Sequence, residues 1–277
     1  KPLLPGTLKK KIPLRKLASP WPASSHKRTM LALAGCAQPG ATPNTNVAAA
    51  QVLDRLGITL VEENRAGCCG ALSYHLSKHE EGLNFMRRNI DAWWPAIESG
   101  AEAIVIMASG CGTTVKEYGH LLRLDPIYAE KAKRVSELSK DLSEVLLAED
   151  LATLPLSVDS KRTAVHCPCS LQHGQQLPDI LDQVLSRCGV SLSNTVDNHL
   201  CCGSAGSYSL LQPDMSEKLL DNKIKALNID SPERIVTANI GCQLHLETKA
   251  TVPVLHWIEI LAARLEAKRE SVRNRHD

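Results

Sequence analysis

The sequence repeats a pair of adjacent cysteines in two similar frames, NRAGCCGALSYHL at residues 64–76 and NHLCCGSAGSYSL at residues 198–210. Each pair is followed by glycine, and a single cysteine stands on either side of it. From one half to the other, the four positions shift by 131, 133, 133 and 131 residues. The eight cysteines of the pattern are Cys36, Cys68, Cys69 and Cys111, then Cys167, Cys201, Cys202 and Cys242. A fixed period with the same chemistry predicts a duplicated folding unit.

Each unit alternates short apolar runs with helical patterns. In the first half we expect strands at 29–35, 58–63 and 101–109, and helices at 45–57 and 78–99, with a third helix beginning at 113. The second half repeats this order with strand-like runs at 162–167, 190–196 and 234–242. The spacing between successive strands matches one βαβ crossover of ~30 residues. The pattern therefore predicts an α/β protein with two tandem Rossmann-like parallel-sheet domains.

In this arrangement every cysteine group follows the carboxyl end of a strand. Such positions converge on one crevice of a parallel sheet. Helix amino termini at that edge favour thiolate over thiol, and the neighbouring glycines suit close approach of the backbone to a bulky inorganic group. Ten cysteines in a large regular chain also differ from the small, loop-rich disulfide scaffolds. We therefore expect metal or redox chemistry in each half.

The division of the chain follows its charge and its repeat. Residues 1–28 hold eight Lys or Arg and no acidic residue, and are rich in Pro and Ser, which is typical of a linker. We expect the first domain at 29–155 and the second at 156–277. Between the repeated parts, 125–150 is predicted to be one helix with Asp125 as its N-cap and Pro126 in its first turn.

The doubled Cys-Cys-Gly pattern resembles the cysteine-rich CCG domain family. That family includes the B subunit of heterodisulfide reductase and the iron–sulfur subunits of lactate and glycolate oxidation. Stretches such as GCAQPGATPNTN, SGCGTTVKEYG, HCPCSLQHGQ and VTANIGCQLHL are similar to the iron–sulfur subunits of bacterial glycolate oxidases. The resemblance covers almost everything after about residue 28.

The resemblance implies an electron-transfer subunit of a flavin-dependent 2-hydroxy-acid dehydrogenase, with glycolate as the expected substrate of the complex. It implies one or two 4Fe-4S clusters on this chain, which an isolated fragment need not load, and FAD on a partner subunit. Electrons would pass from that flavin subunit to a quinone or similar acceptor. Such subunits also carry an amino-terminal ferredoxin module, whose motif is not found here, so we expect the carboxyl-terminal part of one.

The resemblance also assigns ligands, with one departure. All eight repeated cysteines are candidate cofactor-binding residues, and Cys167, Cys201, Cys202 and Cys242 are the preferred metal ligands. The fullest family motif ends in Cys-x-x-Cys, whereas here Thr114 and His245 occupy the last position. Because Cys169 and His245 add further candidate ligands, we expect the second half to hold the occupied site.

Two other functions fit cysteine-rich chains. A structural zinc protein normally uses compact Cys-x2-4-Cys hooks, and Cys167-Pro-Cys169 is one residue short of one. A thiol–disulfide enzyme would use Cys167 with Cys169, or the adjacent pairs, as low-pKa thiols. No group of carboxylates or histidines is spaced for removing a proton from a hydroxy acid, so we expect no substrate chemistry on this chain. We further expect no nucleic-acid partner, and a cytoplasmic location with peripheral attachment to the inner face of the membrane.

Overall fold

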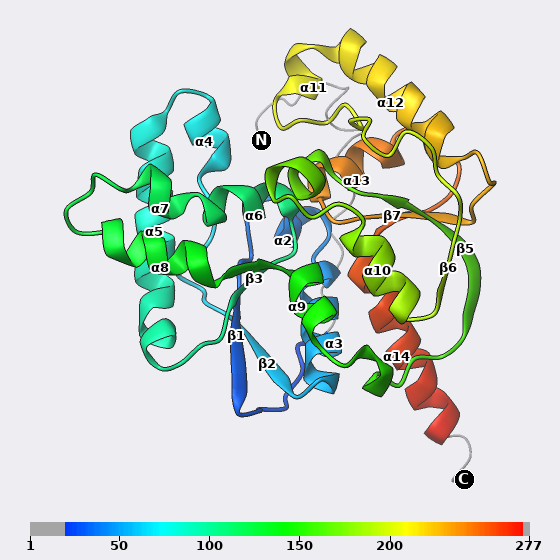
Figure 1. The fold of residues 1–277 in the computed structure, drawn as a ribbon, viewed down its shortest axis with the longest axis horizontal. Helices are drawn as coiled ribbons and strands as arrows, with labels where there is room; N and C mark the ends of the chain where they lie inside the picture. Colours follow the sequence, from blue (N-terminus) through cyan, green and yellow to red (C-terminus); the bar gives the residue numbers. More distant parts are fainter. Residues whose placement is uncertain (1–19, 274–277) are drawn as a thin grey trace.

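The structure, a computed structural model, describes residues 20–273, with side chains through residue 265. The described chain contains two four-stranded sheets in which every strand pair is parallel. The strand orders β2-β1-β3-β4 and β6-β5-β7-β8 are the same order repeated. Figure 1 shows the two sheets in separate halves of the molecule. The predicted fold class is confirmed.

In the first half, strands and helices alternate as the sequence predicts. The strands are β1 (Arg28–Ala32), β2 (Ile58–Glu62), β3 (Ile104–Ile106) and β4 (Ser139–Asp141). The main helices are α3 (Asn44–Arg55), α5 (His79–Glu98), α6 (Ser109–Lys116), α8 (Ala129–Leu138) and α9 (Leu142–Ala148). Three short helices, α2 (Gln38–Ala41), α4 (Ala71–His75) and α7 (Tyr118–Leu121), complete this half.

The second half has the same plan. Its strands are β5 (Asp159–His166), β6 (Val190–Leu192), β7 (Arg234–Thr237) and β8 (Val254–His256). Its helices are α10 (Ile180–Arg187), α11 (Tyr208–Leu211), α12 (Pro213–Leu227), α13 (Ile240–Glu247) and α14 (Trp257–Arg273). The short helical turns η1 (Leu151–Thr153) and η2 (Ser170–Gly174) precede and follow β5.

The single helix predicted for 125–150 is wrong, because a strand interrupts it. Asp125 does accept hydrogen bonds from the backbone N–H groups of Ile127 and Tyr128, just before α8. The next residues after α8 form β4, which pairs with β3. Asp141 then caps α9 through a capping box with Glu144. The motif Asp-x-x-Glu is a helix-start signal that the helical periodicity of the whole segment conceals.

Part of the predicted linker packs against the first sheet. Residues 1–19 lie outside the described residues, but residues 20–27 run along β2. The indole Nε1–H of Trp21 donates to the carbonyl of Leu60 at 3.0 Å, and the N–H of His26 donates to Thr59 Oγ1 at 2.7 Å. This segment therefore covers the outer edge of the sheet.

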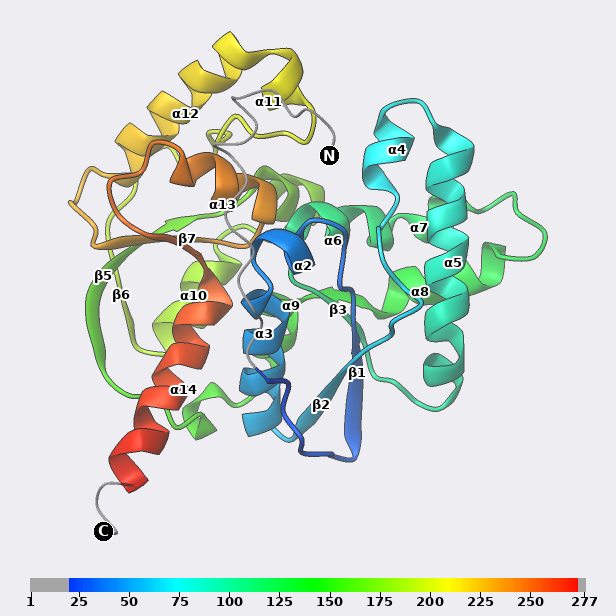
Figure 2. The same cartoon turned by 180° about the vertical axis from the view of Figure 1, so that it is seen from behind.

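The two halves share one hydrophobic core. Alternate residues of β1 point to opposite faces, so Met30 and Ala32 enter the shared core while Leu31 and Leu33 enter a separate outer core. Helix α14 packs on α3, and α10 packs on α9, so helices of both halves lie between the two sheets. Figure 2 shows α14 beside α3 from behind. Along the chain, the expected boundary between residues 155 and 156 falls after the last strand of the first sheet and before the first strand of the second. Leu154 and Leu156 on either side of it both pack in the shared hydrophobic core.

No helix of the described chain is both long enough and apolar enough to cross a membrane.

Hydrogen bonds also connect the two halves. His256, at the end of β8, is 2% exposed, and its Nε2–H donates to the carbonyl of Met107 at 2.7 Å. Its Nδ1 accepts the N–H of Ile258 at 3.3 Å, so the ring is held neutral. Burial lowers the pKa of His256 to about 4.

This burial predicts a loss of stability in acid. Because the folded-state pKa of His256 lies below its unfolded value of ~6.5, its contribution is present above pH ~6.5 and is lost as the pH falls toward 4. We expect the stability of the wild type relative to His256→Gln to fall by ~3 kcal/mol between pH 7 and pH 4 in urea unfolding. The matched control is His75→Gln, at an exposed position. A wild-type advantage that stays constant with pH would contradict the prediction.

Candidate metal centres

The first site brings all four predicted cysteines of its half together. Cys36 follows β1, Cys68 and Cys69 follow β2, and Cys111 lies in the first turn of α6. Their side chains form a hydrogen-bonded series in which Cys36 contacts Cys68, Cys68 contacts Cys69, and Cys69 contacts Cys111. Cys36 is exposed and Cys69 is buried, so the series runs from the surface into the sheet edge.

The second site also contains four cysteines, but not the four that were expected. Its hydrogen-bonded series runs from Cys169 to Cys201, Cys202 and Cys242. Cys167 instead lies in the shared hydrophobic core, where it is 8% exposed and burial raises the pKa of its thiol to about 12. Cys169, rather than the preferred Cys167, therefore lies in the cysteine series of the second half.

The physical reason is the position of the last strand residue. β5 ends at His166, Cys167 continues toward the core, and the turn through Pro168 into η2 carries Cys169 to the crevice. A signal for this was present in the spacing, because 31 residues separate Cys169 from Cys201 and 31 separate Cys36 from Cys68.

His245, the other additional candidate, lies behind the second site. Its Nε2 is 3.1 Å from Ser216 Oγ. The same nitrogen would be 3.2 Å from a Cβ added at Gly203, so the ring packs under the Cys-Cys-Gly turn. The structure therefore places His245 against the turn that carries the ligands. In the first half, Thr114 Oγ1 donates to the carbonyl of Gly110 at 3.4 Å.

A left-handed glycine follows the adjacent cysteines in each half. Gly70 has φ +88° and Gly203 has φ +89°. In this conformation, which favours glycine, the chain turns directly after the cysteine pair. An added Cβ at Gly70 would lie 2.6 Å from the carbonyl oxygen of Gly82, and at Gly203 it would collide with the carbonyl of Ser216. Backbone conformation and space both require glycine here.

The same turns direct backbone N–H groups at sulfur. Gly203 N–H donates to Cys201 Sγ at 3.3 Å, and Gly70 N–H bonds to Cys68 in the same way. Thiol donation from Cys36 and from Cys169, together with these N–H groups, holds the pKa of Cys68 and of Cys201 well below the usual thiol value. Thiolate is the form that binds metal, so Cys68 and Cys201 are each favoured as a thiolate donor in their site.

The two sites differ in the buried groups beneath them. In the first, the amide of Asn89 donates to the carbonyl of Cys68 at 2.9 Å and accepts the N–H of Gly67 at 2.9 Å. The corresponding residue on α12 is Lys223, which is fully buried and donates to the carbonyls of Asp197 and Asn198 at 3.2 Å. Burial lowers the pKa of Lys223, while the nearby Cys169 raises it.

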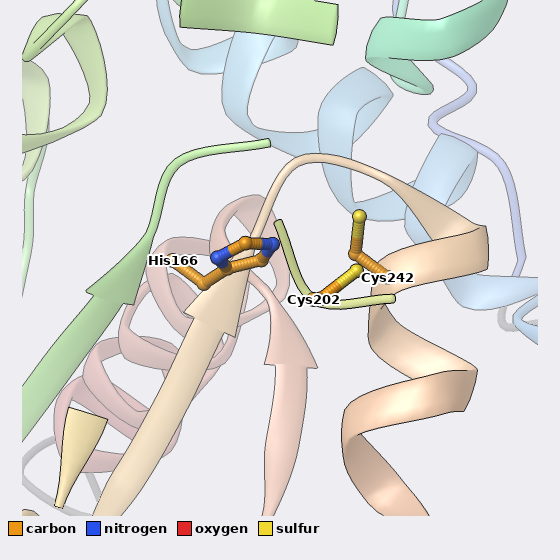
Figure 3. A group of neighbouring side chains, drawn as sticks. All are labelled: His166, Cys202 and Cys242. Atoms are coloured by element: carbon orange, nitrogen blue, oxygen red, sulfur yellow. The ribbon is translucent and has the colours of Figure 1, made fainter. Parts of the chain in front are cut away.

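A histidine that the sequence analysis did not select also joins the second site. His166 at the end of β5 is fully buried, and its ring lies with Cys202 and Cys242 so that one ligand atom of each is within 4.8 Å of the others. Figure 3 shows the ring directed toward the two sulfur atoms. The sequence shows only a histidine beside a cysteine. The burial of this strand end, which distinguishes His166 as a candidate ligand, becomes visible only in the structure.

The donor sets fit a thiolate-bound metal group. Four cysteine sulfurs per half are the usual ligands of a 4Fe-4S cluster and also of structural zinc. Cys167 and Cys169 do not face each other as a hook or as a redox pair, since one is in the core and the other in the crevice. The zinc-hook and Cys167/Cys169 thiol-exchange interpretations thus lose their geometric basis.

Comparison with known proteins gives matches over both halves. A family model described as a cysteine-rich domain, CCG, matches residues 30–116 and again 163–247. The glycolate oxidase iron-sulfur subunit of Escherichia coli is 54% identical over 267 residues, which span 96% of this chain and 65% of the relative. The probable glycolate oxidase iron-sulfur subunit of Bacillus subtilis is 30% identical over 80% of this chain and 50% of its own length. This chain therefore spans half to about two thirds of these relatives.

Other matches are more distant. Lactate utilization protein A of Bacillus licheniformis is 27% identical over 80% of this chain and 93% of the relative. Among solved structures, a hypothetical protein from Helicobacter pylori matches with a TM-score of 0.59 at 11% identity, covering 91% of this chain and 52% of that one. That likeness concerns the fold alone. Because the family model matches both halves, this chain belongs to the cysteine-rich CCG domain family.

Proposed function

We propose that this chain is an iron–sulfur, electron-transferring part of a flavin-dependent 2-hydroxy-acid dehydrogenase, and that the complex oxidises glycolate. The observation that carries the proposal is the pair of four-cysteine series, one at the strand tips of each half. The names of the relatives support iron–sulfur chemistry and glycolate. Bound clusters would supply one-electron transfer.

The residues of this chain would hold and tune such clusters. The eight thiolates Cys36, Cys68, Cys69, Cys111, Cys169, Cys201, Cys202 and Cys242 would be the ligands. N–H groups of the two Cys-Cys-Gly turns would stabilise negative charge on sulfur, as hydrogen bonds to cluster sulfurs do. Removal of hydrogen from the hydroxy acid would fall to a partner subunit carrying FAD, with a quinone or similar acceptor receiving the electrons. We place the complex in the cytoplasm, at the inner face of the membrane.

Anaerobic metal analysis of the full-length subunit tests the proposal. We expect ~4 iron and ~4 acid-labile sulfide per occupied half, in addition to those of the amino-terminal ferredoxin module that the resemblance implies. Iron and sulfide no higher than the ferredoxin module accounts for, or zinc in place of the additional iron, would overturn it.

Two cysteines separated by a single proline give a matched pair of variants. Cys169→Ala removes a crevice thiol and should abolish cluster loading in the second half, whereas Cys167→Ala changes only a core position. We expect the first variant to lose ~4 iron and ~4 sulfide per chain, the content of one cluster. The second variant should retain the wild-type iron content, with a loss of stability of ~1 kcal/mol. Equal iron loss in both would contradict the assignment of Cys169.

Lys223 should raise the midpoint potential of the second centre relative to that of the first. A buried cation favours the more negative, reduced state of a nearby cluster. At an effective dielectric constant of ~20 and a distance on the order of 8–10 Å, one charge contributes ~2 kcal/mol, or roughly 90 mV for one electron. We expect Lys223→Met to lower the midpoint potential of the second centre, measured by EPR-monitored redox titration.

The control for this experiment is Lys225→Met, on the exposed side of the same helix. It removes the same charge where water screens it, so its potential should match the wild type. Equal shifts in both variants would show that Lys223 has no special role.

A further inference from the structure

We propose that His166 is a nitrogen ligand of the metal centre in the second half, which would then have four sulfur donors and one imidazole. The inference rests on the proposed function and adds a residue and a donor type to the second site alone. One ring nitrogen would bind metal through its lone pair while the other keeps its proton, so ligation involves no redox change.

The first argument is the environment of the ring. His166 is fully buried, and within the described part of the chain neither ring nitrogen has an oxygen or nitrogen hydrogen-bond partner. Leaving a buried polar group unpaired costs ~1–3 kcal/mol. The polar atoms that the ring does meet are the sulfurs of Cys202 and Cys242. A histidine in these surroundings is explained if a metal completes its coordination.

The second argument is convergence from three separate elements. His166 ends β5, Cys202 belongs to the Cys-Cys-Gly turn after β6, and Cys242 lies in the first turn of α13. Their ligand atoms lie within 4.8 Å of one another, and Figure 3 shows them facing one space. Cys201 and Cys169 continue the same series of side chains toward the surface. The imidazole and the four cysteine sulfurs thus lie together at the carboxyl ends of the strands.

The third argument comes from the internal repeat. In the first sheet Leu31 pairs with Ile104, and in the second Ala164 pairs with Ile235. This register makes Leu33 the counterpart of His166, each two residues beyond the paired residue: His166 is the last residue of β5, and Leu33 directly follows the end of β1. Leu33 is 2% exposed and packs in the outer core of its half. An apolar side chain is therefore compatible with this buried position of the fold. Packing alone does not explain why the second half has an imidazole there.

Histidine nitrogen detected at the reduced cluster is the direct test. The full-length subunit in its complex would be produced with 15N-labelled histidine, purified without oxygen, reduced with dithionite and measured by pulsed EPR. We expect a hyperfine coupling from one histidine nitrogen in the wild type. It should be absent in His166→Leu, which copies the first half, and retained in His245→Gln, which changes the buried histidine behind the turn.

The outcomes separate this inference from the proposed function. A wild-type cluster signal without histidine nitrogen coupling would overturn the inference and leave the iron–sulfur function standing. A coupling that persists in His166→Leu would also overturn it. If His166→Leu does not fold, the labelled wild type and His245→Gln still decide the question. Absence of iron and sulfide from the wild type would instead overturn the proposed function, and the inference with it.

Discussion

The left-handed glycine after each cysteine pair is the constraint on which both candidate sites depend. At Gly70 and Gly203 the chain turns with positive φ, and the carbonyls of Gly82 and Ser216 lie where a β-carbon would be. The turn also directs its own N–H group at the sulfur of Cys201, which helps to lower the pKa of that thiol. The remaining cysteines of each site come from the segments that follow the other strands of the same sheet.

Duplication of this unit produced two sites with the same skeleton and different surroundings. The shared core between the sheets keeps the halves in a fixed relation, while the outer cores diverge. The first site lies over the neutral Asn89 and beside Leu33, and the second over Lys223 and beside His166. Arg88 also contributes positive charge near Cys68, but it is exposed, so water screens it more than the buried ammonium. The four cysteines of each series therefore lie in different electrostatic surroundings.

Sequence reasoning recovers the architecture because the repeat encodes it directly. Matched cysteine spacing and βαβ lengths predict the parallel sheets and the meeting of thiols at strand tips. The choice between Cys167 and Cys169 depends on where β5 ends, and strand ends are poorly marked in sequence. β4 escapes detection because Ser139–Asp141 interrupts a segment whose flanking residues keep helical periodicity. His166 and Lys223 could not be selected, since what distinguishes them is complete burial beside sulfur, a tertiary property.

The two sites are also joined through hydrogen bonds at the domain interface. Gly110 N–H, next to Cys111, donates to Asn239 Oδ1 at 3.4 Å, and Asn239 Nδ2–H donates to Cys242 Sγ at 3.5 Å. Ser109 N–H adds a 3.0 Å bond to the carbonyl of Ala238. The first turns of α6 and α13, each carrying one cysteine of a series, are therefore fastened to each other. These hydrogen bonds fix the separation of the two turns at the interface, as the proposed electron transfer between the two centres would require.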